Sequence, residues 1–264
     1  MDLKNFYTHL DEYAYREWFE GIETPWQPLD ALQQSVSDAL DGLQDVRKVS
    51  SFDGLMLAKN DTLSRLNEPA CYVERWVEIE EPVLLEPLGI YLDKGTVLEP
   101  SALIKGPALI GKGCEIRQGA YLRGNVVVGD HCVIGHNTEI KNSILMNHTE
   151  VGHFNYIGDS IIGSYVNLGA GSRLANLEFR SPEDKRDMLF PRILMEVDGS
   201  EIHTGRSKFG AVLGDYVEVG CNAVLCPAVL LGKESWVYPN ITVPKGYYPP
   251  LTRLAPADRK IKPR

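Results

Sequence analysis

The sequence has no apolar run near the roughly 18 residues that a membrane-spanning helix requires, and it has no excess of basic residues. Its formal net charge is −9 at pH 7, and its pI is near 5.2. General nucleic-acid binding is disfavoured, because it needs a basic face that displaces counterions from phosphates. The 264 residues are 44% apolar and 24% charged, a balance typical of a globular chain. The chain is expected to bind neither nucleic acid nor membrane.

Cysteine is also scarce: five residues form no CxxC pair. A disulfide scaffold and a zinc ribbon depend on closely spaced cysteines, so neither is expected. The first residues, MDLKNFYTHLDEY, lack the apolar core of a signal peptide. The sequence therefore predicts a soluble, cytoplasmic protein.

An apolar residue recurs every six positions through the middle of the chain. The run comprises Leu92, Leu98, Ile104, Ile110, Ile116, Leu122, Val128, Ile134, Ile140 and Met146. It resumes at Val151, Ile157, Ile162, Leu168 and Leu174, with two steps of five, and again at Leu213, Val219, Leu225, Leu231 and Val237. Self-similarity at a fixed period is typical of a repeat architecture.

A six-residue period cannot turn one face of a straight strand or a regular helix toward a core. It can do so if the chain turns by about 120° after each hexad, so that three short strands form a coil of about 18 residues. Stacked coils then form a triangular prism whose strands pair at about 4.8 Å. Cys114 and Cys132 lie one coil apart and are expected to be stacked interior thiols.

The hexad also divides the chain into parts. Residues 1–90 lack it and show helical spacing followed by short apolar runs broken by prolines, which predicts an α/β cap on the first coils. The prism is expected to span residues 91–244, with an excursion at 177–207 that a coil cannot absorb. Residues 245–264 are expected to form a proline-rich, locally basic tail.

The two five-residue steps lie around His153, in a segment dense in polar groups. These groups are Glu139, Lys141, His148, His153, Asn155, Tyr156 and Asn167. In so regular a repeat, a local departure indicates a backbone shaped for something besides stacking. His153 is therefore the leading candidate for a functional residue.

The stretch HFNYIGDSIIGSYVNLGAG resembles the acetyltransferase segment of the bifunctional enzymes that acetylate glucosamine-1-phosphate and then uridylylate the product. The resemblance continues through AYLRGN and TEIKNS upstream and KFGAVLGDYVEVG downstream, and extends to the C-terminal domains of archaeal-type sugar-1-phosphate nucleotidyltransferases and their free-standing relatives. It implies the mainly β, left-handed parallel β-helix of hexapeptide-repeat acyltransferases. It also implies a homotrimer with active sites between neighbouring prisms, and acetyl-CoA as acyl donor.

The resemblance also implies roles for individual residues. His153 falls on the general base, and Glu139 falls on the carboxylate that orients it. The positions that hold the sugar phosphate are Arg123, Lys141, Tyr156, Asn167 and Lys208. The positions near the acyl and pantetheine path are Ala170 and Cys221, and a tail residue that meets the coenzyme is Arg253.

These residue types suit acetyl transfer from a thioester to the amine of an amino-sugar 1-phosphate. The attacking amine must lose a proton, which an imidazole can accept near neutral pH. A carboxylate on the far ring nitrogen would fix the tautomer. Arg123, Lys141 and Lys208 supply positive charge for a phosphate. The step itself requires no metal, and the sequence fixes neither the sugar nor the acyl length.

Other interpretations stay open. The γ-class carbonic anhydrases share the fold and use two histidines five apart, as are His148 and His153. A zinc site needs a third ligand, yet residues 92–130 contain no histidine, His131 is too close, and His136 is a poor substitute. The chain could instead be a non-catalytic partner of a separate sugar nucleotidyltransferase, or use an acyl-carrier-protein donor. Uridylyl transfer by this chain is not expected, because no glycine-rich nucleotide loop precedes the prism.

Overall fold

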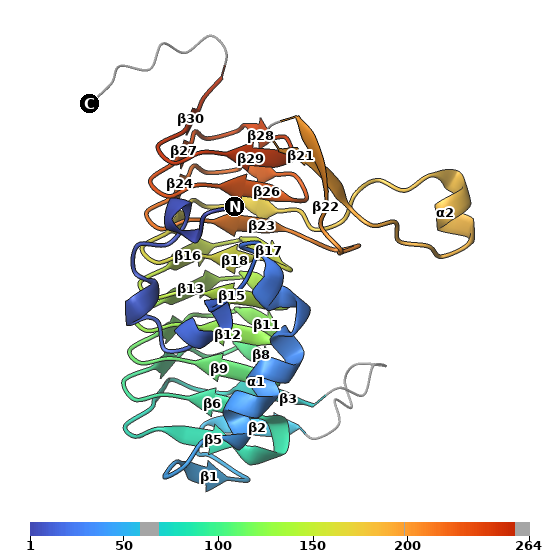
Figure 1. Ribbon diagram of the computed structural model, residues 1–264. Coiled ribbons are helices and arrows are strands. Elements are labelled where there is room, and N and C mark those ends of the chain that lie inside the picture. Colours follow the sequence, from blue (N-terminus) through green and yellow to red (C-terminus); the bar gives the residue numbers. More distant parts are fainter. Residues whose placement is uncertain (59–68, 198, 257–264) are drawn as a thin grey trace.

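The computed structural model of the chain describes residues 1–58, 69–197 and 199–256. Its short strands wind into a parallel β-helix, a three-sided rod with one sheet on each side (Figure 1). The predicted mainly β architecture of stacked coils is therefore confirmed. Within the described ranges, no helix combines the length and the apolarity that crossing a bilayer demands.

The three sides of the rod are sheets A, B and C. Sheet A comprises β1 (Arg47–Val49), β5 (Val83–Leu85), β6 (Ile90–Leu92), β9 (Ala108–Ile110), β12 (Val126–Val128), β15 (Ser143–Leu145), β18 (Ile161–Ile162), β23 (Ala211–Leu213), β26 (Val229–Leu231) and β29 (Gly246–Tyr248). Sheet B comprises β2 (Leu55–Ala58), β3 (Ala70–Val73), β8 (Leu103–Lys105), β11 (Tyr121–Arg123), β14 (Glu139–Lys141), β17 (Tyr156–Gly158), β20 (Arg173–Leu174), β25 (Val224–Leu225) and β28 (Thr242–Val243). Sheet C comprises β4 (Val77–Glu78), β7 (Val97–Leu98), β10 (Glu115–Ile116), β13 (Val133–His136), β16 (Glu150–His153), β19 (Asn167–Leu168), β24 (Glu218–Val219), β27 (Trp236–Val237) and β30 (Arg253–Leu254).

The helices lie outside the rod, except for the 3₁₀ helix that joins β5 to β6. The α-helices are α1 (Leu32–Asp41) and α2 (Pro182–Arg186), and the short 3₁₀ helices are η1 (Leu3–Asn5), η2 (Leu10–Glu12), η3 (Arg16–Phe19), η4 (Gln27–Asp30) and η5 (Glu86–Leu88). A separate antiparallel hairpin is formed by β21 (Leu194–Val197) and β22 (Ser200–His203).

Inward-facing residues stack in register from coil to coil. On sheet B, Leu122 pairs with Ile104 on one side and Ile140 on the other, and all three are fully buried. Cys114 and Cys132 are likewise buried. The hexad thus corresponds to a continuous column of core side chains, whose burial is the main favourable term in folding.

One position of the predicted hexad is wrong. Leu145 belongs to the core of the rod, whereas Met146 faces outward and packs beneath the N-terminal segment. Neighbouring residues of a strand point to opposite faces, so a shift of one residue exchanges inside for outside.

The coil becomes one residue shorter at this point. Val126 lies 18 residues after its partner Ala108, but Ser143 lies only 17 residues after Val126. The shortening falls at the corner between sheets B and A. There a single residue with left-handed backbone turns the chain, first Asn142 (φ 44°) and in the next coil Asp159 (φ 52°).

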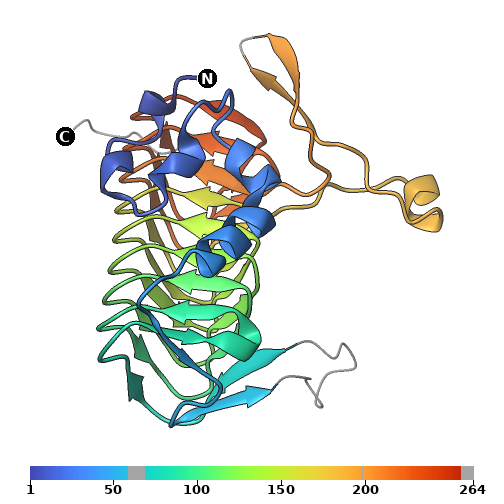
Figure 2. The ribbon, with the colours of Figure 1, turned by 60° about the horizontal axis from the view of Figure 1, so that its bottom comes forward.

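Residues 1–90, predicted as one cap on the first coils, divide into two parts. Strands β1 to β5 close one end of the rod, and several of their pairings are antiparallel. Residues 1–43 instead run along the outer face of sheet A (Figure 2). That face needs a cover because it is apolar: Leu84, Leu109, Val127, Ile144, Ile161, Val212 and Leu230. The residues that pack on it include Phe6, Tyr13, Phe19, Trp26, Leu32 and Val36.

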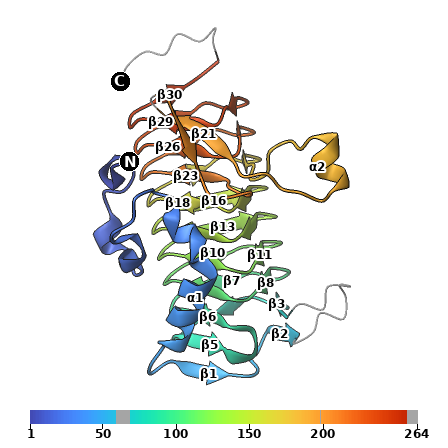
Figure 3. The same cartoon turned by 45° about the vertical axis from the view of Figure 1, so that its right-hand side comes forward.

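Between β20 and β23 the chain leaves the rod. This excursion carries α2 and the β21–β22 hairpin, and it projects from a different side than the N-terminal segment (Figure 3). Ile193 and Met195 of the hairpin arm are buried in the same apolar layer as the N-terminal segment. The rod also continues past residue 244, because β29 and β30 extend sheets A and C. Residues 257–264 of the predicted tail lie outside the described residues.

Candidate functional site

Three of the five side chains predicted to hold a sugar phosphate, Arg123, Lys141 and Tyr156, lie on the outer face of sheet B. They flank the inward-facing residues of successive strands, so the alternation of a strand points them to solvent. Glu139 pairs in register with Tyr121 on one side and with Tyr156 on the other. Arg123 and Lys141 occupy the ends of the strands that carry Tyr121 and Glu139.

Arg123 and Glu139 form an ion pair on this face. The Arg123 Nη1 donates to Glu139 Oε1 at 2.6 Å, and the guanidinium lies 5.8 Å from the centre of the Tyr121 ring. The hydrogen bond that Arg123 donates to Glu139 raises the pKa of Arg123, whose side chain stays 42% exposed. The pair therefore presents a positioned cation to solvent, which suits recognition of a phosphate.

His153 lies at the corner where sheet C ends and sheet B begins. Its backbone N–H donates to Asn155 Oδ1 at 3.1 Å, while the Asn155 amide donates to Gly169 O and Ser172 Oγ at 2.9 and 2.8 Å. Asn155 is buried, so it fixes the corner from inside and leaves the imidazole exposed. The ring stacks on His136 of the preceding coil at 5.8 Å.

The structure does not join Glu139 to His153 in the way that the resemblance implies. The Glu139 carboxylate is held by Arg123, and within the described residues no hydrogen bond or ion pair links it to the imidazole. The two residues are nevertheless neighbours across the corner, because the Glu139 N–H donates to the Asn155 carbonyl at 2.9 Å. To orient the His153 ring, the Glu139 carboxylate would have to leave Arg123 and bind the imidazole.

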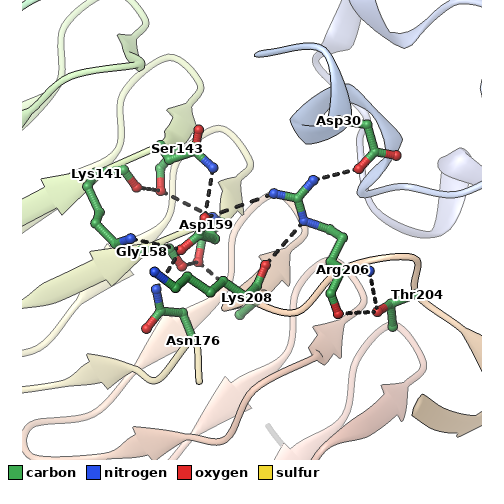
Figure 4. A network of polar contacts seen from close by, with 12 residues as sticks. Asp30, Lys141, Ser143, Gly158, Asp159, Asn176, Thr204, Arg206 and Lys208 are labelled. Carbon is green, nitrogen blue, oxygen red and sulfur yellow. Dashed lines mark hydrogen bonds and ion pairs between the residues drawn. The ribbon is translucent and has the colours of Figure 1, made fainter. Parts of the chain in front are cut away.

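A buried carboxylate, Asp159, stands behind Lys141 (Figure 4). Lys141 Nζ lies 3.3 Å from Asp159 Oδ2, which also accepts from the Asn176 amide at 2.5 Å. Asn176 in turn accepts from the Tyr156 hydroxyl at 3.2 Å. Burial, followed by the charges of Glu139 and Asp159, raises the pKa of Tyr156 and keeps it a hydrogen-bond donor.

Lys208 lies at the end of the excursion, near the same carboxylate. It lines a pocket of about 380 Å³ with Asp159, Arg206 and Arg192. Its ammonium also lies 5.5 Å from the centre of the Phe190 ring. The structure thus brings Lys208 to the Lys141 side of the rod, although the excursion separates them in sequence.

The residues predicted to meet the coenzyme lie on sheet C. Cys221 lines an apolar pocket of about 460 Å³ with Trp236, Tyr238 and Asn167, the last of which was predicted to hold the sugar phosphate. Asn167 Nδ2 donates to Glu218 Oε2 at 2.9 Å, and Cys221 is exposed.

Two further predicted coenzyme residues border this pocket. Ala170 directly follows its lining residue Gly169, and the Ala170 carbonyl accepts from Asn222 N at 2.9 Å. The Arg253 guanidinium stacks 4.1 Å from the centre of the Trp236 ring. An apolar trough with a cation at its rim could hold the chain and a phosphate of a coenzyme.

The predicted residues therefore form two groups with His153 at the corner between them. Arg123, Glu139, Lys141, Tyr156 and Lys208 lie toward sheet B. Asn167, Ala170, Cys221 and Arg253 lie toward sheet C, which separates Asn167 from the other predicted sugar-phosphate residues.

His148, the other histidine of the zinc alternative, contacts different residues. His148 stacks between His131 at 5.2 Å and Tyr165 at 4.6 Å, at the corner between sheets A and C. His153 lies at the other end of β16. Among residues 1–58, 69–197 and 199–256, no three or more His, Cys, Asp or Glu side chains converge as a metal site would need.

The sequence analysis did not identify Asp159, Asn176 or Arg206. A signal for Asp159 was present, because the five-residue step from Ile157 to Ile162 brackets it. Asn176 and Arg206 carried no such signal, since they lie at the edges of the excursion and only the fold returns them to the corner.

Known proteins match the rod. The family profile described as "GMPPB C-terminal domain" matches residues 104–235. The bifunctional sugar-1-phosphate nucleotidylyltransferase/acetyltransferase of Sulfurisphaera tokodaii is 37% identical over 110 residues, covering 42% of this chain and 25% of that protein. The bifunctional protein GlmU of Methanococcus vannielii is 38% identical over 112 residues, covering 42% and 25%. The chain thus spans about a quarter of the length of these relatives.

Two other matches are weaker. The bifunctional protein GlmU of Buchnera aphidicola is 29% identical over 171 residues, covering 65% of this chain and 31% of that protein. A solved mutant of perosamine N-acetyltransferase from Caulobacter crescentus, in complex with CoA and GDP-perosamine, aligns with a TM-score of 0.24 and 12% identity, covering 64% of this chain and 57% of that chain.

Proposed function

Since the chain belongs to the family of the GMPPB C-terminal domain, we propose that it transfers an acetyl group from acetyl-CoA to the amine of an amino-sugar 1-phosphate such as glucosamine-1-phosphate. The relatives described as bifunctional nucleotidylyltransferase/acetyltransferases support the acetyltransferase part of this proposal. The observation that carries it is the exposed imidazole of His153 at a corner between the sheet that carries Arg123 and Lys141 and an apolar pocket.

In the proposed reaction, the acceptor phosphate binds Arg123 and Lys141 on sheet B, with the Tyr156 hydroxyl beside them. The acetyl group and the pantetheine arm of acetyl-CoA lie in the sheet C pocket at Cys221. The amine nitrogen forms a bond to the thioester carbon while the carbon–sulfur bond breaks. His153 takes the proton from nitrogen and returns it to the leaving thiolate, so the products are an amide and a free thiol.

The proposed assembly is a homotrimer with each site between two prisms. A corner of a rod is convex, so sheets B and C of one chain face away from each other. A second copy lying along the corner would close the space in which the amine meets the thioester. Sheet A is already covered by residues 1–43, which leaves sheets B and C as the faces available to a neighbour.

The test is thiol release from acetyl-CoA in the presence of glucosamine-1-phosphate. His153→Ala should lower kcat by about 10²- to 10⁴-fold, because the general base is lost. His203→Ala is the matched control, since His203 is an exposed histidine on the excursion hairpin. Circular dichroism should show the same fold for both variants.

Near-normal turnover of His153→Ala would refute the assignment of the base. An unmodified chain that releases no thiol with any amino-sugar phosphate would refute the enzyme proposal and favour a non-catalytic partner of a nucleotidyltransferase. Release with an acyl-carrier-protein thioester alone would change the donor and keep the mechanism.

A further inference from the structure

Asp159 is a carboxylate buried between two cations. Its side chain is 6% exposed, and it lies 3.3 Å from Lys141 Nζ and 3.9 Å from Arg206 Nη2. Its remaining acceptor capacity is used by Asn142 Nδ2 at 2.8 Å and Asn176 Nδ2 at 2.5 Å. An unpaired charge in such a place would be strongly destabilising, so these partners have to be held together.

The partners of Asp159 come from parts of the chain that are distant in sequence (Figure 4). Lys141 belongs to sheet B, whereas Asn176 lies where the excursion begins and Arg206 where it ends. The two ends of the excursion are also held by backbone hydrogen bonds, from Phe209 N to Asn176 O at 3.0 Å and from Gly210 N to Asp159 O at 2.9 Å. Asp159 thus ties both ends of the excursion to the face that carries Lys141.

Arg206 extends this connection to the N-terminal segment. Its Nη1 donates to Asp30 Oδ1 at 2.5 Å, and its Nε donates to the Lys208 carbonyl at 3.3 Å. Its side chain is only 13% exposed, while Asp30 is 54% exposed. The guanidinium is therefore held in place beside Asp159 and supplies the second positive charge there.

We propose that Asp159 is a positioning residue of the acceptor site. It holds the Lys141 ammonium directly and the Tyr156 hydroxyl through Asn176, and Arg206 balances its charge. This inference rests on the proposed function, because Lys141 and Tyr156 are there the groups that meet the sugar phosphate. It also gives the excursion a role, because Asn176 and Arg206 at its two ends help to hold the acceptor site in place.

The test is Asp159→Asn, which removes the charge and keeps the shape. Asparagine suits the left-handed backbone of this corner, since Asn142 occupies it in the preceding coil. The acceptor KM should rise about tenfold or more, while the acetyl-CoA KM changes less than about twofold, because only the acceptor groups lose their support. Arg206→Gln should raise the acceptor KM by a smaller factor, and Arg206→Lys should restore most of it.

Asp30→Asn is the matched control. It removes the exposed partner of Arg206 and leaves Asp159 with Lys141 and Asn176, so the acceptor KM should change less than about twofold. An Asp159→Asn variant that behaves like Asp30→Asn would overturn the proposal. So would a loss confined to kcat, or equal increases in both KM values.

Crystal structures of Asp159→Asn and the unmodified chain separate this proposal from the proposed function. The Lys141 ammonium and the Tyr156 hydroxyl should leave their positions in the variant, whether or not the chain acetylates sugars. Unchanged positions of both groups would overturn the positioning role. Absence of acetyl transfer by the unmodified chain would refute only the proposed function.

Discussion

At the scale of single residues, two tyrosines in the segment that covers sheet A have hydroxyl groups without a partner. The hydroxyls of Tyr7 and Tyr13 are buried, and neither makes a hydrogen bond within the described part of the chain. Burial raises the pKa of both well above the ordinary value, and for Tyr7 the charge of Asp215 adds to the effect. The hydroxyls therefore add little to the free energy of unfolding near pH 7, and they lower it at alkaline pH.

The sign of the alkaline effect follows from proton linkage. Above the ordinary tyrosine pKa, about 10, the unfolded chain loses these protons while the native chain keeps them, so the free energy of unfolding falls as pH rises. Tyr7→Phe and Tyr13→Phe should change that free energy by less than about 1 kcal/mol at pH 7. Both should reduce its loss between about pH 10 and 11. Urea unfolding at the two pH values measures this, and an unchanged alkaline loss in the double variant would contradict it.

At the scale of elements, a pair of glycines lets β13 and β16 approach closely beside the candidate base. Gly135 and Gly152 precede His136 and His153, and the register pairs Ile134 with Val151 and the two histidines with each other. A Cβ on Gly135 would overlap the Gly152 carbonyl, whereas a Cβ on Gly152 would meet nothing within 4 Å. Glycine is therefore required at position 135 and not at position 152.

Gly135→Ala should lower the free energy of unfolding by about 2 kcal/mol or more, because the backbone of the next coil has to move. Because that movement displaces β16, it should also lower the proposed acetyl transfer, in which His153 is the base. Gly152→Ala is the matched control and should change stability by less than about 1 kcal/mol. Thermal unfolding and the thiol-release assay provide the two measurements. If both substitutions lowered the free energy of unfolding equally, the close approach of Gly135 to the Gly152 carbonyl would not be the reason that glycine is required.

At the scale of the whole molecule, the three sides of the rod differ. Sheet A is sealed by the N-terminal segment, which the buried Asp215 fastens by accepting from the backbone N–H groups of Thr8 and His9. Sheet B carries the ion pairs of Arg123 with Glu139 and of Lys141 with Asp159, and sheet C carries the apolar pocket. A site that uses both needs a second wall across a convex corner, which is the reason for expecting an oligomer.

The homotrimer that the family resemblance implies should give a native mass of three times the 29.4-kDa chain in light scattering. The trimer should persist on dilution to the concentrations of the activity assay. An active species with the mass of a single chain would contradict the shared site. An inactive single chain that becomes active on association would support it.

The sequence predicted the architecture well because a β-helix is built from local periodicity. Each hexad places one apolar residue inward, so positions such as Ile104 and Leu122 follow from counting. The error at Met146 arose where the corner loses one residue, and an apolar residue on either side of the strand made two registers look equal in sequence. The apolar outer face of sheet A could not be assigned a cover, because its contacts with residues 1–43 are long-range.

The order of residues along the chain by itself determined the stacked coils, the column of core side chains and the polar segment around His153, because all three depend on spacing within a few turns. Only the tertiary structure decided which groups meet: Arg123 with Glu139, and Lys141, Asn176 and Arg206 around Asp159. A buried charge selects its partners by distance and desolvation, and these act through space between segments that the sequence keeps apart.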